Sequence, residues 1–362
     1  MGAAERPVTE RAIYAARPVV RFNGAELEAA SIGLTHLILT ESIDGLASLE
    51  MKLANWLSLD DGSAGLAFDA GSSIALGAAV EVIFGSEAPG TLFDGRVSGI
   101  EIEAGLGAPP GITVRAEDSL MRARLARRTR IYEDLSLADL AQRVGADLGL
   151  TVRAIDVPPV TALWAQFNES DLAFLRRVLA RHDCTLSIGG GDLRIGRRIA
   201  AGGETIDLQL MSQLRRVQVG ADLAHQCTRV TAAGFDPVQG APFNVESDGV
   251  SVGSGRGTRG DELLAQHFGQ RSEHLAELAS MTEREAQALA DGAFDRRARE
   301  FVTARGTVEG NPRLRAGSRV ALAGLGRRFD NTYEVARCTH RFDLADGYQT
   351  DFVAHCAFLA EP

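Results

Sequence analysis

Alternation of apolar and polar side chains with a period of two is the feature that most limits how this chain can fold. Near the start, Leu49, Met51 and Leu53 alternate with charged residues. Such a period places one set of side chains in a core and the other set toward water, as in a strand with one buried face. Further alternating runs, separated by turns rich in glycine and proline, cover residues 80–84, 100–103, 112–115 and 348–358. We therefore predict a barrel or a sandwich of short strands in the first third, and strands again at the end.

The period changes to that of a helix in the middle of the chain. Apolar residues fall on one helical face over residues 137–148, after a capping-box-like pair of Ser136 and Asp139 and before Gly149. A second amphipathic helix is predicted over residues 170–182. Short strands are expected after each helix, at residues 150–155 and 185–195. This segment is predicted to be a small α/β insertion.

The rest of the chain is predicted to alternate between strands and helices. The expected strands cover residues 214–219 and 227–233, a polar glycine-rich loop covers 244–260, and helices cover 261–268 and 282–301. Because strands follow these helices, the second β region is predicted to be interrupted by them.

Charge and composition exclude several classes of protein. The 362 residues include 38 basic and 48 acidic ones, a formal net charge of −10, whereas binding to nucleic acid or anionic lipid needs a basic face. Lys52 is the only lysine and lies in a strand-like run, which argues against Schiff-base chemistry or a P-loop. No run reaches the roughly 18–20 apolar residues of a membrane span, and residues 1–17 lack the apolar core of a signal peptide. The cysteines, which lack CxxC spacing and are expected to be buried and reduced, are Cys184, Cys227, Cys338 and Cys356.

Residues 255–260, with the sequence GRGTRG, fit the GxGxxG pattern and precede a predicted helix. A dinucleotide site also needs a buried strand directly before the loop, inside a βαβ unit. Residues 244–253 are polar apart from the brief run 250–252, so the pattern favours a flexible loop. A nucleotide-binding protein that uses this loop stays open as an alternative.

Cys338, His340, His355 and Cys356 are residue types that bind zinc. If residues 341–347 form a hairpin loop, His340 pairs near residue 348 and Cys338 near residue 350, while Cys356 lies opposite the start of the first strand. At about 3.3 Å per strand residue, the four groups cannot converge within one hairpin. We therefore predict core and surface side chains here, and no metal site.

No residue pattern supports catalysis. The motifs HExxH and GxxxxGK[ST] do not occur. The carboxylate pairs Asp60–Asp61 and Glu169–Asp171 are expected on a solvated surface or at a helix start. A basic run, expected on a solvated face or in an intersubunit salt-bridge rim, comprises Arg122, Arg124, Arg127, Arg128 and Arg130. We assign no catalytic, cofactor-binding or metal-binding residue, and predict that the chain is not an enzyme and takes no cofactor.

Several segments, taken in order, resemble the phage late control gene D family of tail hub proteins, which is similar to the N-terminal hub region of VgrG in type VI secretion and contractile injection systems. The most specific is residues 164–175, WAQFNESDLAFL, which resembles the family signature Q-x-x-E-S/T-D-x-x-F-L. Other matching segments are residues 93–100, 112–118, 130–132, 234–237 (a turn that ends the central hairpin), 314–324, 333–335, His340 and 347–352. The resemblance spans roughly residues 20–358.

This resemblance implies a β-rich α+β fold, with two tail-tube-like β-barrel domains and with α/β and helical insertions. The expected boundaries are 14–130 for the first barrel, 131–200 for the α/β insertion domain, 201–243 with 302–362 for the second barrel, and 244–301 for a loop and helical insertion. The implied function is a structural baseplate hub, in which three chains form a ring that adapts a hexameric tail tube to a trimeric spike.

The resemblance also implies partners and a location. The expected partners are two further copies of the chain, a trimeric spike protein, the tail tube protein and other baseplate proteins, with no membrane and no sequence-specific nucleic acid. We expect assembly in the bacterial cytoplasm, into a phage tail or injection particle. Because the sequence ends at Pro362, just after the last family strand, the spike is expected on a separate polypeptide. The acidic balance predicts an acidic lumen that repels passing DNA. A baseplate-associated cell-wall hydrolase is the alternative.

Overall fold

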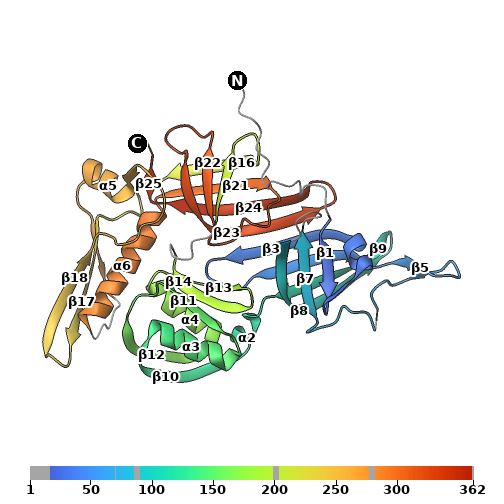
Figure 1. Cartoon of the computed structure of the whole chain (residues 1–362), viewed down its shortest axis with the longest axis horizontal. Helices are drawn as coiled ribbons and strands as arrows, with labels where there is room; N and C mark the ends of the chain where they lie inside the picture. The colour runs from blue at the N-terminus through green and yellow to red at the C-terminus, as the bar shows by residue number, and fades with distance from the viewer. Residues whose placement is uncertain (1–16, 70, 85–89, 199–203, 277–281, 361–362) are drawn as a thin grey trace.

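The computed structural model describes residues 17–69, 71–84, 90–198, 204–276 and 282–360. Strands hold 51 % of the residues and helices 18 %, so the predicted β-rich α+β class is confirmed. Figure 1 shows the N-terminal strands beside the C-terminal strands, the α/β segment below them, and the long helix α6 (Glu283–Arg299) at one side. The described strand pairings do not close either β region into a barrel.

One run of eight strands crosses the molecule, and each neighbouring pair in it is antiparallel. In spatial order the strands are β16 (Leu214–Ala221), β21 (Val302–Glu309), β24 (Gly347–Cys356), β23 (Asn331–Asp343), β3 (Leu34–Ser42), β4 (Ser48–Ala54), β9 (Ala108–Glu117) and β8 (Gly90–Gly105). The pairing of β23 with β3 joins the C-terminal half to the N-terminal half, with Arg341 opposite Ile38. We call this set the eight-strand run.

The same sheet continues and branches beyond this run. Past β8 it extends through β7 (Ala79–Phe84), β1 (Val19–Phe22) and β2 (Ala25–Glu26), while β22 (Arg319–Ala323) pairs with β23 and with β15 (Thr205–Gln209). The predicted alternation is confirmed in β4 and β24. In β24 every second residue is buried, from Tyr348 to Cys356.

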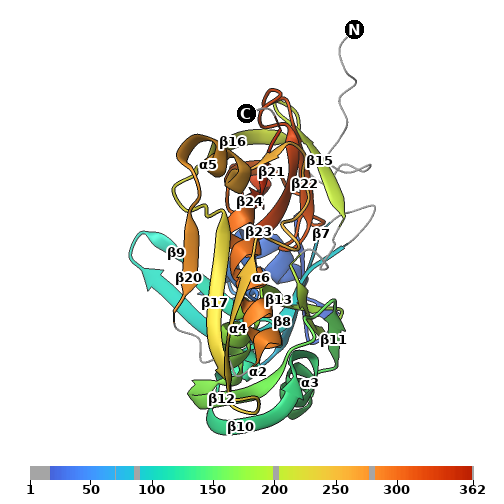
Figure 2. The same cartoon turned by 90° about the vertical axis from the view of Figure 1, so that its left-hand side faces the viewer.

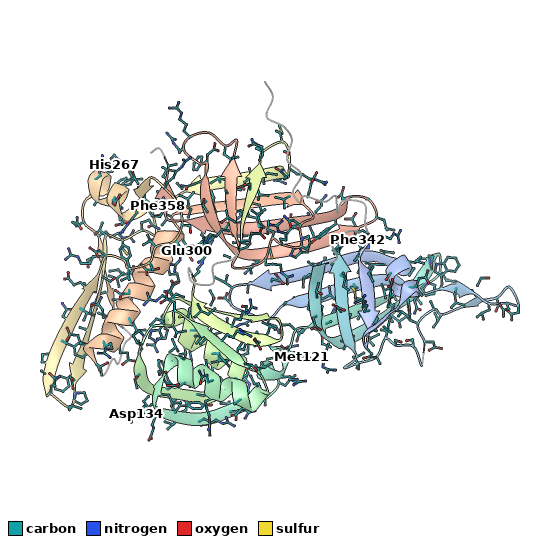
Figure 3. The ribbon with its side chains drawn as sticks, viewed as in Figure 1. Met121, Asp134, His267, Glu300, Phe342 and Phe358 are labelled. Carbon is teal, nitrogen blue, oxygen red and sulfur yellow. The ribbon has the colours of Figure 1, made fainter. Side chains whose placement is uncertain are left out.

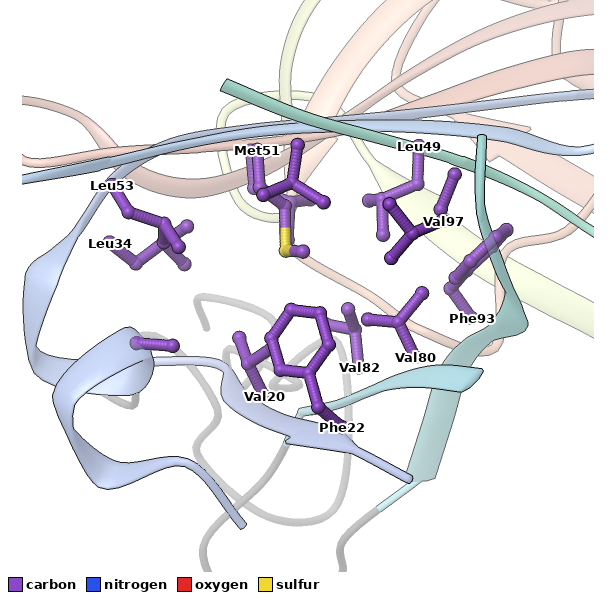
Figure 4. Close-up of a cluster of buried hydrophobic side chains, with 14 of the residues drawn as sticks. Val20, Phe22, Leu34, Leu49, Met51, Leu53, Val80, Val82, Phe93 and Val97 are labelled. Atoms are coloured by element: carbon purple, nitrogen blue, oxygen red, sulfur yellow. The ribbon is translucent and has the colours of Figure 1, made fainter. Parts of the chain in front are cut away.

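The N-terminal core lies between β1 and β7 on one side and β3, β4 and β9 on the other (Figure 4). Met51 is completely buried at its centre, and Val20 and Phe22 face it from β1. The short helix α1 (Glu28–Gly33) contributes Ala30. The tip of the β23–β24 hairpin also enters this core, because the Tyr348 ring stacks on Phe84 with 3.9 Å between ring centroids. Residues far apart in the sequence therefore share one core.

The α/β segment contains both predicted helices. Helix α3 (Leu137–Leu148) begins after Ser136, whose hydroxyl accepts from the Asp139 amide, and ends at Gly149 in the left-handed conformation. Helix α4 (Asp171–Arg181) begins after Ser170. The remaining elements are α2 (Met121–Arg124), β10 (Arg127–Ser136), β11 (Val152–Ile155), β12 (Thr161–Ser170), β13 (Cys184–Gly189) and β14 (Asp192–Arg197). The pairing of β10 with β12 adds two ten-residue strands that the sequence pattern did not predict.

The helical part is built on a small sheet, with α6 packed against its strands (Figure 2). Thr282 caps α6, because its side-chain oxygen accepts from the Glu285 amide. The resemblance placed a turn at residues 234–237, but the strand runs to Asp236 and the turn follows it. The other elements of this part are β17 (Arg229–Asp236), β18 (Ala241–Ser247), β19 (Thr258–Arg259), α5 (Gly260–Phe268), β20 (Ser272–Leu275) and β25 (Phe358–Leu359). In the N-terminal half, β5 (Leu57–Ser58) pairs with β6 (Ala64–Gly65).

Candidate assembly surface

The eight-strand run has one polar face along its whole width. These side chains alternate with the core residues of the same strands, because successive residues of a strand point to opposite faces. Residues on this face include Arg216, Gln218, Arg305, Thr307, Asp351, Thr339, Arg341, His36, Thr40, Glu50, Lys52, Thr113, Arg115, Glu101 and Glu103. Lys52 thus lies on an exposed sheet surface.

Opposite charges neutralise much of this face. The Arg115 guanidinium contacts the carboxylates of Glu50 at 3.0 Å and Glu101 at 2.9 Å. On the other half, Arg341 contacts Asp351 at 2.6 Å. These pairs are solvent-exposed and contribute little to stability. The acidic excess of the whole chain is therefore not concentrated on this face.

Each end of the eight-strand run has a free edge within the described part of the chain. Strand β16 pairs along its length only with β21. Strand β8 pairs with β7 over residues 90–96, but beyond residue 97 it pairs only with β9. An unpaired edge presents backbone donors and acceptors that can bind another strand. These two edges are the main candidate sites for assembly.

Large apolar side chains are exposed near the free edge of β8. Ile100 is 37 % exposed and Ile102 55 % exposed, although both point to the core side of the sheet. Leu106 at the end of this hairpin is fully exposed. Trp56, between β4 and β5, is 53 % exposed. Apolar surface gathered at an edge is typical of a protein–protein contact.

The GxGxxG segment is packed against the C-terminal strands rather than free. Gly257 has φ +111°, and a Cβ atom there would overlap the backbone of Leu359. The Arg256 amide donates to Asn331 Oδ1 at 3.0 Å, and Asn331 Nδ2 donates back to the Arg256 carbonyl at 2.9 Å. Residues 248–257 form a loop, as predicted, and these contacts pack its end against the C-terminal strands. No strand enters it directly, and the helix α5 that follows belongs to no βαβ unit, so the nucleotide-binding alternative gains no support.

The cysteine and histidine positions differ from the predicted hairpin register by two residues. His340 lies opposite Thr350 and Cys338 opposite Phe352, because the connecting turn is shorter than predicted. His355 lies opposite Glu334, at the far end of the hairpin. The four residues considered as zinc ligands are therefore spread along two strands, as expected from the sequence.

Cys338 and His340 instead meet Glu41 of β3, and one ligand atom from each lies within 4.8 Å of the others. Sequence reasoning missed Glu41 because the pairing of β23 with β3 connects segments about 300 residues apart. All three side chains are buried.

Hydrogen bonds from protein side chains satisfy the Glu41 carboxylate at the centre of this buried cluster. Arg315 Nε donates to Glu41 Oε2 at 2.8 Å, and a second Arg315 nitrogen donates to Oε1. The Cys338 thiol donates to Glu41 Oε2 at 3.4 Å. Burial lowers the pKa of His340 to about 4 and raises the pKa of Cys338 well above its usual value. The cluster thus holds one ion pair, a neutral imidazole and a thiol, and it ties the two halves together.

Three of the four carboxylates considered for catalysis, Asp61, Glu169 and Asp171, have structural partners. Asp61 accepts from Ser63 in an exposed turn. Glu169 contacts Arg177 at 2.5 Å, and the buried Asp171 contacts Arg128 at 3.1 Å.

The basic run is also engaged within the chain. Arg124 contacts Glu117 at 2.6 Å, Arg130 contacts Asp147, and Arg127 donates to the Asn168 carbonyl at 3.0 Å. Arg122, Arg124 and Arg127 are exposed, which fits the predicted solvated face, and the intersubunit rim stays a prediction.

A cleft of about 900 Å³ lies where the N-terminal core, the α/β segment and residues 313–318 meet. Asp118 on its wall accepts from the amides of Ala47 and Leu120. Burial raises the pKa of this carboxyl to about 6. Charged residues from all three parts line the cleft together with apolar side chains.

A family model for the Alg8 N-terminal domain matches residues 19–343. The chain belongs to the Alg8 N-terminal domain family. This match covers the N-terminal strands, the α/β segment, the helical part and all of β23. No curated protein matches the sequence.

Solved structures share the fold of this Alg8 N-terminal domain protein over nearly its whole length. The 43 kDa tail protein of prophage MuSo2 from Shewanella oneidensis is 16 % identical, with TM-score 0.67, over 93 % of this chain and 97 % of that one. A tail protein from Neisseria meningitidis MC58 is 12 % identical, with TM-score 0.64, over 96 % and 99 %. The c3393 protein of Escherichia coli, described as a type VI secretion component similar to the T4 tail proteins gp27 and gp5, is 11 % identical, with TM-score 0.59, over 95 % and 79 %.

These identities show the fold alone. At that level the predicted resemblance to phage tail and type VI secretion proteins is confirmed. Among the described helices of the Alg8 N-terminal domain protein, none is long and apolar enough to cross a membrane.

Proposed function

We propose that the chain is a structural hub of a contractile tail or injection machine, and that three copies form a ring. The observation that carries this proposal is the eight-strand run, with its continuous polar face and a free edge at each end. The shared fold of phage tail and type VI secretion proteins supports it.

Strand direction favours closure into a ring. Neighbouring strands alternate in direction, so in an even set the first and last strands point in opposite directions. The last strand of one copy can therefore pair antiparallel with the first strand of the next copy. Three copies would supply a closed ring of 24 strands, with the polar face toward the lumen. Since this face carries both charge signs, the acid excess predicted for the lumen is not present on it.

The division of the run supports two tube-like units in each chain. Strands β16, β21, β24 and β23 come from the C-terminal half, and β3, β4, β9 and β8 from the N-terminal half. Three chains would then present six similar positions to a sixfold tail tube on one face, and threefold symmetry to a spike on the other. We keep the boundaries 14–130, 131–200, 201–243 with 302–362, and 244–301 as the proposed domains.

The proposed partners are two further copies, the tail tube protein, a trimeric spike protein and other baseplate proteins. Assembly is proposed to occur in the bacterial cytoplasm, before incorporation into the tail or injection particle. The proposed role is non-enzymatic, and the structural partners of Asp61, Glu169 and Asp171 support it.

The mass in solution tests this function. Light scattering of the purified chain, alone and with the spike protein, is expected to give three times the 38.5 kDa chain mass, at least when the spike is present. A monomer under both conditions would contradict the hub function.

A further inference from the structure

We propose that the ring is closed by one specific seam, in which the free half of β8 (residues 98–105) pairs antiparallel with β16 of the next copy. This inference rests on the proposed function and identifies its contact surface. In the proposed register Ile102 lies opposite Val217, which also places Glu103 opposite Arg216 and Ile100 opposite Val219.

The first half of the seam is the edge of β8 beyond residue 97. The Val97 amide donates to the Ala78 carbonyl at 2.9 Å, and the Gly77 amide donates to the Val97 carbonyl at 2.8 Å. After these bonds β8 continues to Gly105 with only β9 beside it. Seven or eight residues of edge are thus free in the described structure, enough for a strand of ordinary length.

The second half of the seam is the edge of β16. Leu214 is bridged to Leu210, but residues 216–221 have only β21 beside them among the described residues. Val217 and Val219 point to the core side and are half-buried, while Arg216 and Gln218 are exposed on the polar face. Both edges therefore have an apolar side and a polar side, in the same alternation.

Side-chain complementarity selects the register. With Ile102 opposite Val217, both isoleucines of β8 face valines on the core side, and Glu103 faces Arg216 on the polar side. A shift of one residue would place isoleucines on the polar face. A register shifted by two residues toward Arg215 places Ile102 opposite Arg215. A register shifted by two residues toward Val219 moves Glu103 away from Arg216.

The free chain leaves these groups without equivalent contacts. Ile102 is 55 % exposed, although β8 pairs with β9 over residues 96–105 and Ile102 lies opposite the buried Ile112. Within the described residues neither Glu103 nor Arg216 has an ion-pair partner, whereas Glu101 is held by Arg115. Pairing with a second copy would cover the isoleucines and give both charges a partner.

The symmetry of the contact fits a closed ring. The two edges differ, so the contact is heterologous, head to tail, and gives a ring when the rotation closes. Strands β8 and β16 terminate opposite ends of the eight-strand run and do not pair with each other in the described structure of one chain.

Engineered disulfides test the seam directly. In the full chain, Ile102→Cys with Val217→Cys places two cysteines opposite each other, at a Cα separation of about 5 Å, which a disulfide can bridge. Oxidation in the presence of the spike is expected to give covalent dimers and trimers on a non-reducing gel. The matched control, Ile102→Cys with Gln218→Cys, puts the thiols on opposite faces and is expected to stay at the wild-type background. Equal cross-linking in both pairs, or in neither, would overturn the proposed register.

Charge reversal provides a second test that does not depend on oxidation. Glu103→Arg or Arg216→Glu alone places like charges across the seam, and each is expected to raise the concentration for half-assembly by about fivefold or more. The double variant restores an opposite pair at every seam and is expected to return near wild type. Two single effects that simply add in the double variant would overturn this pairing.

The two experiments separate failure of the seam from failure of the hub function. A trimer by light scattering without the specific cross-link or charge rescue would remove the seam and leave the hub intact. A monomer with and without the spike would contradict both.

Discussion

Replacing Tyr348 with alanine is expected to destabilise the N-terminal core, although the residue lies near the end of the sequence. Tyr348 is 3 % exposed, its ring stacks on Phe84, and its hydroxyl contacts His340 Nδ1 at 2.9 Å. Phe342 of the same hairpin, labelled in Figure 3, lies opposite Tyr348 in the strand pairing and also packs against Phe84. Truncation of a buried aromatic side chain typically costs about 3–5 kcal/mol, which changes an opening equilibrium by about two to four orders of magnitude.

Native-state hydrogen exchange locates this loss. In Tyr348→Ala, amides of β4 around Met51 are expected to exchange faster by about the same factor as amides of β24, because both strands depend on one core. Gln349→Ala, on the opposite face of the same strand, is the matched control and is expected to change exchange little. Faster exchange confined to the C-terminal strands would refute the shared core.

Two further perturbations follow from buried groups. His340 has a folded pKa of about 4 against about 6.5 unfolded, so the stability that its neutral form contributes is complete above pH 6.5 and is lost as the pH falls toward 4. Between pH 7 and 5 the free energy of unfolding should fall by about 2 kcal/mol because of His340. Urea titrations of His340→Gln at the two pH values should therefore show a loss about 2 kcal/mol smaller than in wild type. An equal loss in both proteins would contradict the low pKa of His340. Gly257→Ala should cost about 2–3 kcal/mol, since φ is +111° and Leu359 blocks the Cβ position. A thermal melt equal to wild type would show that the segment is loose.

Local structure was predictable where the signals were local. Helix α3 has the predicted bounds because Ser136 and Gly149 mark its ends and its apolar residues keep a helical period. The strand β12 before Ser170 was missed, since its apolar residues are spread over both faces: Trp164 is buried while Phe167 is 66 % exposed.

Long-range pairing was not predictable in the same way. Nothing in the period of β23 indicates that β3 is its neighbour, so the cluster around Glu41 could not be found from spacing alone. The hairpin register was wrong by two residues, although a signal was present. Asp343 accepts from the amides of Ala345 and Asp346 and so forms a tight turn, which ends at Gly347. Aspartate and glycine at such positions are typical of short turns.

The predicted absence of a metal site was argued from strand spacing within one hairpin. That reasoning did not include a third strand, which brings Glu41 to Cys338 and His340. Arg315 occupies both oxygens of Glu41, which the sequence also could not reveal, because this contact spans 274 residues.

An electron cryomicroscopy map of the chain bound to its spike would show whether the ring forms. We expect a threefold particle whose inner wall is a continuous ring of 24 strands, with β8 of each copy beside β16 of the next. A map in which the two edges stay apart, or in which the polar face of the eight-strand run points away from the central channel, would contradict it.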